Sequence, residues 1–295
     1  MNNQQVFRFD ILKYRMFAAA ISIFIVFAAG LKYFSGTRFQ YSVDFTGGTQ
    51  VHLQFDQSMS AEKIKSLLSQ DGWAHVTTRD FGEKDILVRV SEVATDAKGL
   101  GERIQQAIVN QDSSLNPVIM QCESVGKGVG ASLRHNSLKA IVLALLVMLL
   151  YILIRFWSLG FAVGSVVALM HDLAIMLAIF LLLEREISTN VIAAILAILG
   201  YSINDTIVIF SQIRNNMHKM NSASMYSIVN SSINQMLRRT ILTSVSTALP
   251  VLAMLFFGGE ALFDISLSLI IGIVFGTFSS VFIASPIMML FVNRK

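Results

Sequence analysis

Long apolar runs, separated by short polar segments, occupy most of the chain outside residues 50 to 135. A helix needs roughly 20 such residues to cross a bilayer. Six runs approach that length: Met16–Leu31, Ala140–Ile154, Leu159–Leu183, Val191–Phe210, Ile241–Phe257 and Ile265–Val292. The first two are short, and interfacial aromatic residues can extend them. The pattern predicts an α-helical bundle of six transmembrane helices.

The first run has a second interpretation. Ala28–Gly30 resembles the small-residue site at which a signal peptide is cleaved. Under either interpretation, the residues that follow this run are delivered to the far side of the membrane.

The segment between the first two runs has the pattern of a folded domain. Thr49–Phe55 alternates as a strand does, and Ser60–Gln70 has helical spacing after a serine cap. Further strands are predicted at 74–81, 85–93 and 116–125, and a second helix at 99–111. The order βαββαβ predicts a ferredoxin-like α+β domain. We interpret the glycine-rich Gly126–Gly130 that follows it as a hinge.

These elements predict three regions. Residues 1–34 form the N-terminus and the first transmembrane helix, residues 35–137 the ferredoxin-like domain, and residues 138–295 the other five transmembrane helices.

Composition supports the membrane assignment. Charged residues make up 14% of the chain and hydrophobic residues 54%, whereas soluble domains carry about 25% charged residues. The net charge of +4 is explained by basic loops that stay on the cytoplasmic side, and no basic patch interleaved with aromatic residues indicates nucleic acid. The single cysteine, Cys122, excludes an intrachain disulfide and a cysteine cluster for a metal.

Basic residues also predict the orientation of the chain. They lie before the first run, between the second and third, between the fourth and fifth, and after the sixth. The positive-inside rule places all of them in the cytoplasm, with both termini, and places the 35–137 domain on the outer, periplasmic side. The residues are Arg8, Lys13, Arg15, Arg155, Arg214, Lys219, Arg238, Arg239, Arg294 and Lys295.

Two charged residues within or just beside the apolar runs are candidates for function. A carboxylate at the bilayer centre costs roughly 2.5–3.5 kcal/mol and persists when it is paired, wet or functional. Asp205 and Arg239 fall on semi-polar faces of consecutive, antiparallel helices, so a pair between them is geometrically allowed. The alternative is that Arg239 anchors its helix beside Arg238 while Asp205 lies near the headgroups. The face of Asp205 comprises Ile198, Tyr201, Ser202, Val208, Ile209 and Gln212, and that of Arg239 comprises Gln235, Met236, Thr243, Ser246, Thr247 and Pro250.

His171 and Asp172 lie midway along the third run. Adjacent helical residues point about 100° apart, so we expect no hydrogen bond between these two side chains and a separate partner for each. Such residues inside a membrane are typical of a proton relay. The alternative is a structural hydrogen bond that fixes helix packing. A metal site is disfavoured, because His135 and His218 lie outside the apolar runs.

Four segments together resemble the SecF branch of the SecD/SecF family. They are VDFTGGTQ at Val43–Gln50, ALMHDLAI at Ala168–Ile175, GYSINDTIV at Gly200–Val208 and RRTILTS at Arg238–Ser244. The order of one span, an external domain and five further spans is similar as well. The resemblance therefore covers nearly the whole chain.

The resemblance implies a subunit of the bacterial inner membrane that pairs with SecD. Together they are expected to use the proton-motive force to help move exported, unfolded polypeptides through the SecYEG channel, with YajC as an associated subunit. No cofactor is implied. The implied proton pathway comprises Asp205, Arg239, Asn204, Thr206, His171 and Asp172, and the family motif at the start of the external domain comprises Asp44, Phe45, Gly47 and Gly48.

Two other functions remain open. A small-molecule efflux half of the same superfamily predicts a substrate pocket and a larger external domain than about 100 residues offer. A passive scaffold predicts that Asp205 and Arg239 tolerate neutral replacement. An enzyme is disfavoured, because the sequence offers no catalytic constellation.

Overall fold

The computed structural model describes residues 9–73, 76–220 and 223–292. The basic residues Arg8, Arg294 and Lys295 used to predict the orientation lie outside these ranges. The chain divides into two compact units. The helical unit consists of Met1–Gln40 and Lys139–Lys295, and the α/β unit consists of Tyr41–Leu138.

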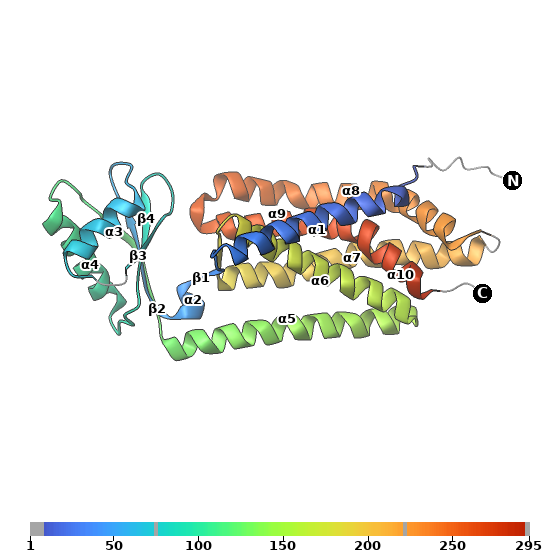
Figure 1. The fold of residues 1–295 in the computed structure, drawn as a ribbon, viewed down its shortest axis with the longest axis horizontal. Helices are drawn as coiled ribbons and strands as arrows, with labels where there is room; N and C mark the ends of the chain where they lie inside the picture. The colour runs from blue at the N-terminus through green and yellow to red at the C-terminus, as the bar shows by residue number, and fades with distance from the viewer. Residues whose placement is uncertain (1–8, 74–75, 221–222, 293–295) are drawn as a thin grey trace. The chain divides into compact units, whose positions relative to one another are not determined.

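The described residues contain six helices long and apolar enough to cross a membrane, which confirms the predicted apolar helices. A short 3-10 turn η1 (Leu12–Tyr14) precedes the first, and the two-residue strands β1 (Gln40–Tyr41) and β6 (Glu186–Ile187) lie outside them. The spans are α1 (Arg15–Phe34), α5 (Lys127–Phe156), α6 (Leu159–Leu182), α7 (Thr189–Lys219), α8 (Met225–Phe257), and α9 (Gly259–Ser279) continued by η2 (Ser280–Ala284) and α10 (Ser285–Phe291). Five of the six, α1, α6, α7, α8 and α9, pack against one another in the helical unit (Figure 1).

Helices α7 and α8 continue well beyond the apolar runs that predict them. Hydrogen bonds between polar side chains join these extensions, beside isolated buried apolar residues such as Ile213 and Ile233. The Asn216 amide donates to the Ser232 hydroxyl at 2.8 Å and to the Gln235 side-chain carbonyl at 3.1 Å. Apolar periodicity alone therefore underestimates the length of both helices.

The last span contains a π-helical turn, η2, which the uninterrupted apolar run does not reveal. Pro286 follows it in the first turn of α10 and has no N–H to donate to the preceding turn. The Ser285 hydroxyl donates to the carbonyl of Ser280 at 3.0 Å, which satisfies one backbone acceptor in the turn. Such turns occur mostly as single insertions in helices.

Glycines allow three of these helices to pack closely. A Cβ added to Gly276 of α9 would lie 2.9 Å from Cβ of Ser202 on α7, and one added to Gly272 would overlap the Ile198 side chain. On α6, a Cβ on Gly164 would lie 2.7 Å from the carbonyl oxygen of Ala284. Gly272 and Gly276 thus allow α9 to lie close against α7.

The α/β unit has the element order that the sequence predicts. A four-stranded antiparallel sheet, in the order β3-β4-β2-β5, carries two helices. Ala74 and His75, the first two residues of the predicted strand 74–81, lie outside the described residues. The elements are β2 (Gly48–Gln54), α3 (Ala61–Gln70), β3 (Thr77–Asp80), β4 (Asp85–Val90), α4 (Ala97–Gln111) and β5 (Val118–Val125).

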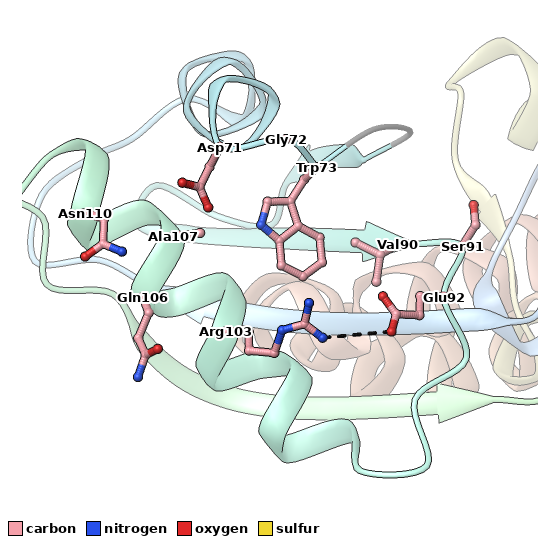
Figure 2. Close-up of a pocket in the computed structure, with 10 residues that line it drawn as sticks. All are labelled: Asp71, Gly72, Trp73, Val90, Ser91, Glu92, Arg103, Gln106, Ala107 and Asn110. Atoms are coloured by element: carbon pink, nitrogen blue, oxygen red, sulfur yellow. Dashed lines mark ion pairs between the residues drawn. The ribbon is translucent and has the colours of Figure 1, made fainter.

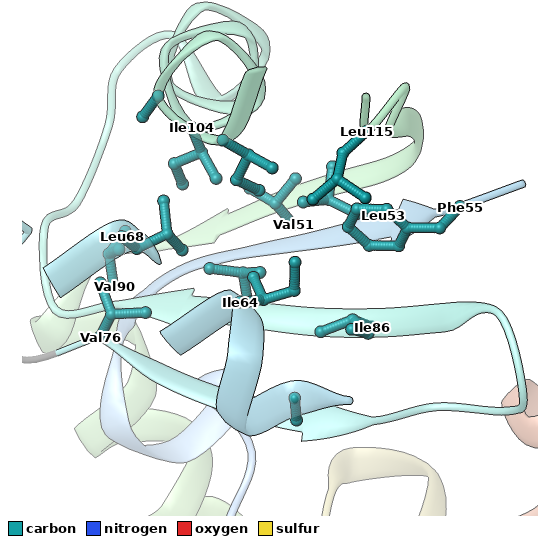
Figure 3. Packing of buried hydrophobic residues seen from close by; sticks show 14 of the residues in the cluster. Val51, Leu53, Phe55, Ile64, Leu68, Val76, Ile86, Val90, Ile104 and Leu115 are labelled. Atoms are coloured by element: carbon teal, nitrogen blue, oxygen red, sulfur yellow. The ribbon is translucent and has the colours of Figure 1, made fainter. Parts of the chain in front are cut away.

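One face of this sheet and the two helices enclose the hydrophobic core of the unit (Figure 3). Alternate strand residues supply the sheet side, and residues at helical spacing supply the other side. The core includes Val51, Leu53, Ile86, Val88, Ile64, Leu68, Ile104 and Ile108, each with no exposed surface.

The interpretation of Gly126–Gly130 as a hinge is wrong, because Lys127–Gly130 form the first turn of α5. A short helix α2 (Val43–Thr46) and Gly47 pack against this turn. A Cβ on Gly130 would lie 3.1 Å from the Gly47 nitrogen, so the glycine serves close packing. Gly47 itself has φ of 71°, and its Cβ would lie 2.8 Å from Cα of Lys127.

Candidate functional site

Asp172 on α6 is the better hydrogen-bonded of the two buried carboxylates on the transmembrane helices that the structure describes. Its side chain is 1% exposed. The carboxylate accepts hydrogen bonds from the Ser202 hydroxyl of α7 at 2.6 Å and from the Ser279 hydroxyl of α9 at 3.0 Å. Three helices therefore meet at this acid, which satisfies the requirement that a buried charge be hydrogen-bonded.

The expectation that His171 and Asp172 form no hydrogen bond with each other is wrong. Nδ1 of His171 lies 3.1 Å from Oδ1 of Asp172. The angle of about 100° between adjacent helical residues describes the directions of their Cα–Cβ bonds. Rotation about the side-chain torsions can still bring the polar ends of His171 and Asp172 together. The expected separate partners are also present, because Nε2 of His171 lies 2.8 Å from the Ser22 hydroxyl of α1.

Asp205 on α7 is the second buried carboxylate. The residue is 3% exposed, so it faces neighbouring helices and not lipid. The Thr277 hydroxyl of α9 donates to its Oδ2 at 3.3 Å. Within the described ranges this is its one hydrogen bond, so Asp205 keeps most of its acceptor capacity unused, in contrast to Asp172.

The two neighbours of Asp205 in the motif have different environments. Thr206 is buried, and its hydroxyl donates to the Ser202 carbonyl at 3.3 Å, one turn earlier on α7. Asn204 is exposed on the opposite side of the helix. Of these two neighbours, Thr206 therefore lies inside the bundle and Asn204 does not.

Arg239 does not form the geometrically allowed ion pair with Asp205. Over the described part of the chain, no ion pair within 4.0 Å joins the two residues, although their charges attract each other. The Arg239 side chain lies on the exposed face of α8, in a shallow hollow of about 650 Å³ with Gln235, Leu242, Thr243 and Ser246. The two polar stripes thus do not face each other directly.

Hydroxyl groups connect Asp205 to α8 in place of the arginine. Oγ1 of Thr277 lies 2.6 Å from Oγ of Ser244, and the Tyr201 hydroxyl donates to Ser244 at 3.3 Å. The sequence analysis placed Tyr201 on the face of Asp205, but it did not select Ser244 or Thr277, nor Ser22 and Ser202 as partners of the His–Asp pair. Their signal was a serine or threonine within an apolar run, which is common in transmembrane bundles and therefore weak.

The α/β unit holds the residues of the family motif and one surface hollow. Phe45 is buried and contacts Tyr41 edge-on, with ring centres 6.3 Å apart, while Gly47 and Gly48 adopt positive φ. Gly48 approaches the Val90 carbonyl, where a Cβ would lie 2.6 Å from the oxygen. These positions serve the geometry of the chain at the start of the unit. Asp44 lies in the first turn of α2 and interacts with another group.

Figure 2 shows the hollow, which has a volume of about 570 Å³ and lies between the end of α3, β4 and α4. The Arg103 guanidinium lies 5.3 Å from the centre of the Trp73 ring and 4.0 Å from the Glu92 carboxylate. Its lining combines an aromatic ring, a cation, carboxylates and amides, and contains neither His nor Cys. Such a surface is suited to binding a polar segment.

Comparisons with known proteins agree with this architecture. A family model for the protein export membrane proteins SecD/SecF, C-terminal, matches residues 104–294, and a model for the SecD/SecF GG motif matches residues 34–59. The protein translocase subunit SecF of Desulfurispirillum indicum is 40% identical over 282 residues, or 93% of this chain and 88% of the relative. That of Haemophilus influenzae is 37% identical over 90% of this chain and 79% of the relative.

A solved structure shows the same fold in a longer protein. The crystal structure of SecDF from Thermus thermophilus, a translocon-associated membrane protein, has a TM-score of 0.87 and 33% identity, covering 99% of this chain and 40% of that chain. The curated SecDF protein of that species is 35% identical over 289 residues, and the present chain spans 38% of its length. The chain belongs to the SecD/SecF family of protein export membrane proteins, and it matches SecF subunits along most of their length.

Proposed function

We propose that the chain is a proton-motive-force-driven subunit of the Sec protein translocase that acts with SecD to promote the late translocation and release of exported proteins. The observation that carries this proposal is Asp205, a carboxylic acid 3% exposed within a transmembrane helix and held by one hydrogen bond. An acid that is so poorly compensated in a low-dielectric site changes its interactions strongly when it gains or loses a proton.

The proton on Asp205 selects between two helix arrangements. The ionised acid attracts Arg239 and requires donors, whereas the neutral acid removes that attraction and can itself donate. A difference of a few kcal/mol between two arrangements of α7, α8 and α9 is then biased by one proton. The membrane potential supplies about 2.3 kcal/mol per charge per 100 mV, which is sufficient for such a bias.

The outer face of α8 is where we place SecD. This face carries Arg239 beside apolar residues that are largely exposed in the single chain: Leu242 at 58%, Val245 at 52% and Leu249 at 61%. The occurrence of SecD and SecF as one SecDF protein in Thermus thermophilus supports a permanent partner. A partner on this face would enclose Arg239 and strengthen its attraction to Asp205, because water no longer screens it.

We propose the inner membrane as the location, with both termini cytoplasmic and residues 35–137 forming the periplasmic domain. The hollow beside Trp73 then faces the compartment in which exported polypeptides emerge. SecYEG and YajC are the further partners that we propose. His171 and Asp172 form a second part of the proton pathway, connected to α7 through Ser202.

Export driven by an imposed proton gradient in membrane vesicles tests the function. Asp205→Asn is expected to abolish the gradient-dependent part of export while the complex with SecD still assembles. Asp112→Asn, which removes a carboxylate of the α/β unit, is the matched control and is expected to leave export unchanged. Full gradient-dependent export by Asp205→Asn would reject the proposal in favour of a passive scaffold.

A further inference from the structure

Four residues from three helices form one unbroken chain of hydrogen-bonding groups that ends on Asp205. The Tyr201 hydroxyl of α7 donates to Ser244 of α8 at 3.3 Å. Ser244 and Thr277 of α9 lie 2.6 Å apart, with either oxygen able to donate. Thr277 donates to Asp205 at 3.3 Å, one turn beyond Tyr201 on α7. This series of hydrogen bonds begins on α7, passes through α8 and α9, and returns to α7.

The donor and acceptor roles along this series of hydrogen bonds can run in either of two directions. Each hydroxyl has one proton and two acceptor positions. With Asp205 ionised, Thr277 donates to it and Ser244 donates to Thr277. With Asp205 protonated, the acid donates to Thr277 and Thr277 donates to Ser244. Ser244 then directs its proton to the carbonyl of Thr240, which lies 2.8 Å away. Both orders therefore leave every hydroxyl proton with an acceptor.

We propose that Tyr201, Ser244 and Thr277 form the relay through which Asp205 gains and loses its proton. The inference rests on the proposed function, in which Asp205 carries the transported proton, and adds a route that does not depend on contact with Arg239. In the uptake step a proton binds the Tyr201 oxygen as the phenol proton moves to Ser244. The Ser244 proton moves to Thr277, and the Thr277 proton moves to Asp205. One proton enters, one arrives, and each hydroxyl group is restored.

The relay is separate from the other charged groups around it. From α6, Asp172 and His171 bond to Ser202, Ser279 and Ser22, none of which is a member of the chain. From α8, Arg239 contributes charge without an ion pair to Asp205. Thr277 is the member on which the relay depends most, because within the described ranges it alone is hydrogen-bonded to the acid.

Thr277→Val tests the relay most sharply, because valine has nearly the shape of threonine, lacks the hydroxyl and leaves no space for a substituting water. In the assembled complex with SecD, we expect gradient-driven export to fall about 100-fold, the lower end of what a positioned proton-transfer group contributes. Thr277→Ser retains the hydroxyl and should restore export. Ser165→Ala is the control, because the hydroxyl of this buried α6 serine donates to the Phe161 carbonyl of its own helix and to nothing else among the described residues.

Infrared spectroscopy of the same complexes supplies a readout independent of export. The C=O stretch of protonated Asp205, assigned by its loss in Asp205→Asn, should shift to higher frequency in Thr277→Val, because a hydrogen bond is removed. An unmoved band, undiminished export by Thr277→Val, or loss of export in both Thr277→Val and Thr277→Ser would overturn the relay. Failure of the proposed function is distinguishable, because it would appear as full export by Asp205→Asn.

Discussion

Ser202 on α7 donates a hydrogen bond to Asp172 on α6 across 2.6 Å. Asp205 lies three residues further along α7 and is buried as well. Asp205, which lies on this turn of α7, and Asp172, which is hydrogen-bonded to it, therefore share one turn of one helix. A displacement of this turn changes the surroundings of both.

Removal of the Ser202 hydroxyl should weaken the contact between α6 and α7. Asp172 would keep Ser279 and His171 but lose its shortest donor, so we expect Ser202→Ala to lower the free energy of unfolding by about 1–3 kcal/mol. The thermal midpoint of the purified protein in detergent measures this. Ser165→Ala, whose hydroxyl bonds within α6, should shift the midpoint much less. Equal shifts for the two variants would contradict the assignment.

The close approach of α7 and α9 predicts a steric cost at Gly272. An alanine Cβ there would overlap the Ile198 side chain, whereas nothing lies within 4 Å of a Cβ on Gly200 of α7. We expect Gly272→Ala to destabilise the protein by about 1–3 kcal/mol, and Gly200→Ala to be neutral or stabilising, since alanine favours helix. Unfolding midpoints of the two variants check this, and a stable Gly272→Ala protein would show that the helices are further apart.

Replacement of Thr240 on α8 should raise stability where the preceding substitutions lower it. Its hydroxyl oxygen is buried without a hydrogen-bond partner among the residues that the structure describes. Replacing an unsatisfied buried hydroxyl by a methyl group removes a desolvation cost of about 1–3 kcal/mol. Thr240→Val should therefore match or exceed the wild-type unfolding midpoint, while Thr277→Val falls below it. A marked loss of stability in Thr240→Val would mean that this hydroxyl has a partner in the membrane.

The single cysteine offers a test of the α/β unit. Burial of Cys122 on β5, and then the negative charge of Glu102, raise the pKa of its thiol. Because the thiolate is the reactive form, less of it exists at a given pH than in an exposed thiol. Alkylation by iodoacetamide at pH 8 should be slower in the folded protein than in urea, and Glu102→Gln should speed it slightly. Equal rates in the folded and unfolded protein would contradict this burial.

Apolar periodicity was sufficient to predict the spans and the order of the α/β elements. It located Leu159–Leu183 within one residue of α6 at its C-terminal end, because the helix is apolar at both ends and along most of its length. It failed where polar pairing carries a helix beyond the apolar run, as between Asn216 and Ser232, and where one proline makes a π-turn inside a run. Neither effect has a signature in hydropathy.

The acidic residues of the candidate site could be predicted from the sequence, but the side chains that hydrogen-bond to them could not. A charge inside an apolar run is visible in the sequence, so Asp172 and Asp205 could be selected. Their partners Ser279 and Thr277 lie 107 and 72 residues away. Which of many serines and threonines faces an acid depends on helix rotation and crossing, and these are fixed by contacts such as that of Gly276 with Ser202.

Proton entry during export tests the central claim most directly. Vesicles that contain the assembled complex and a pH-sensitive dye would report protons that cross the membrane while a polypeptide is exported. The account predicts export-coupled proton flux with the wild-type chain and with Asp112→Asn, and its loss with Asp205→Asn. An undiminished, export-coupled flux in Asp205→Asn would show that this buried acid does not carry the proton.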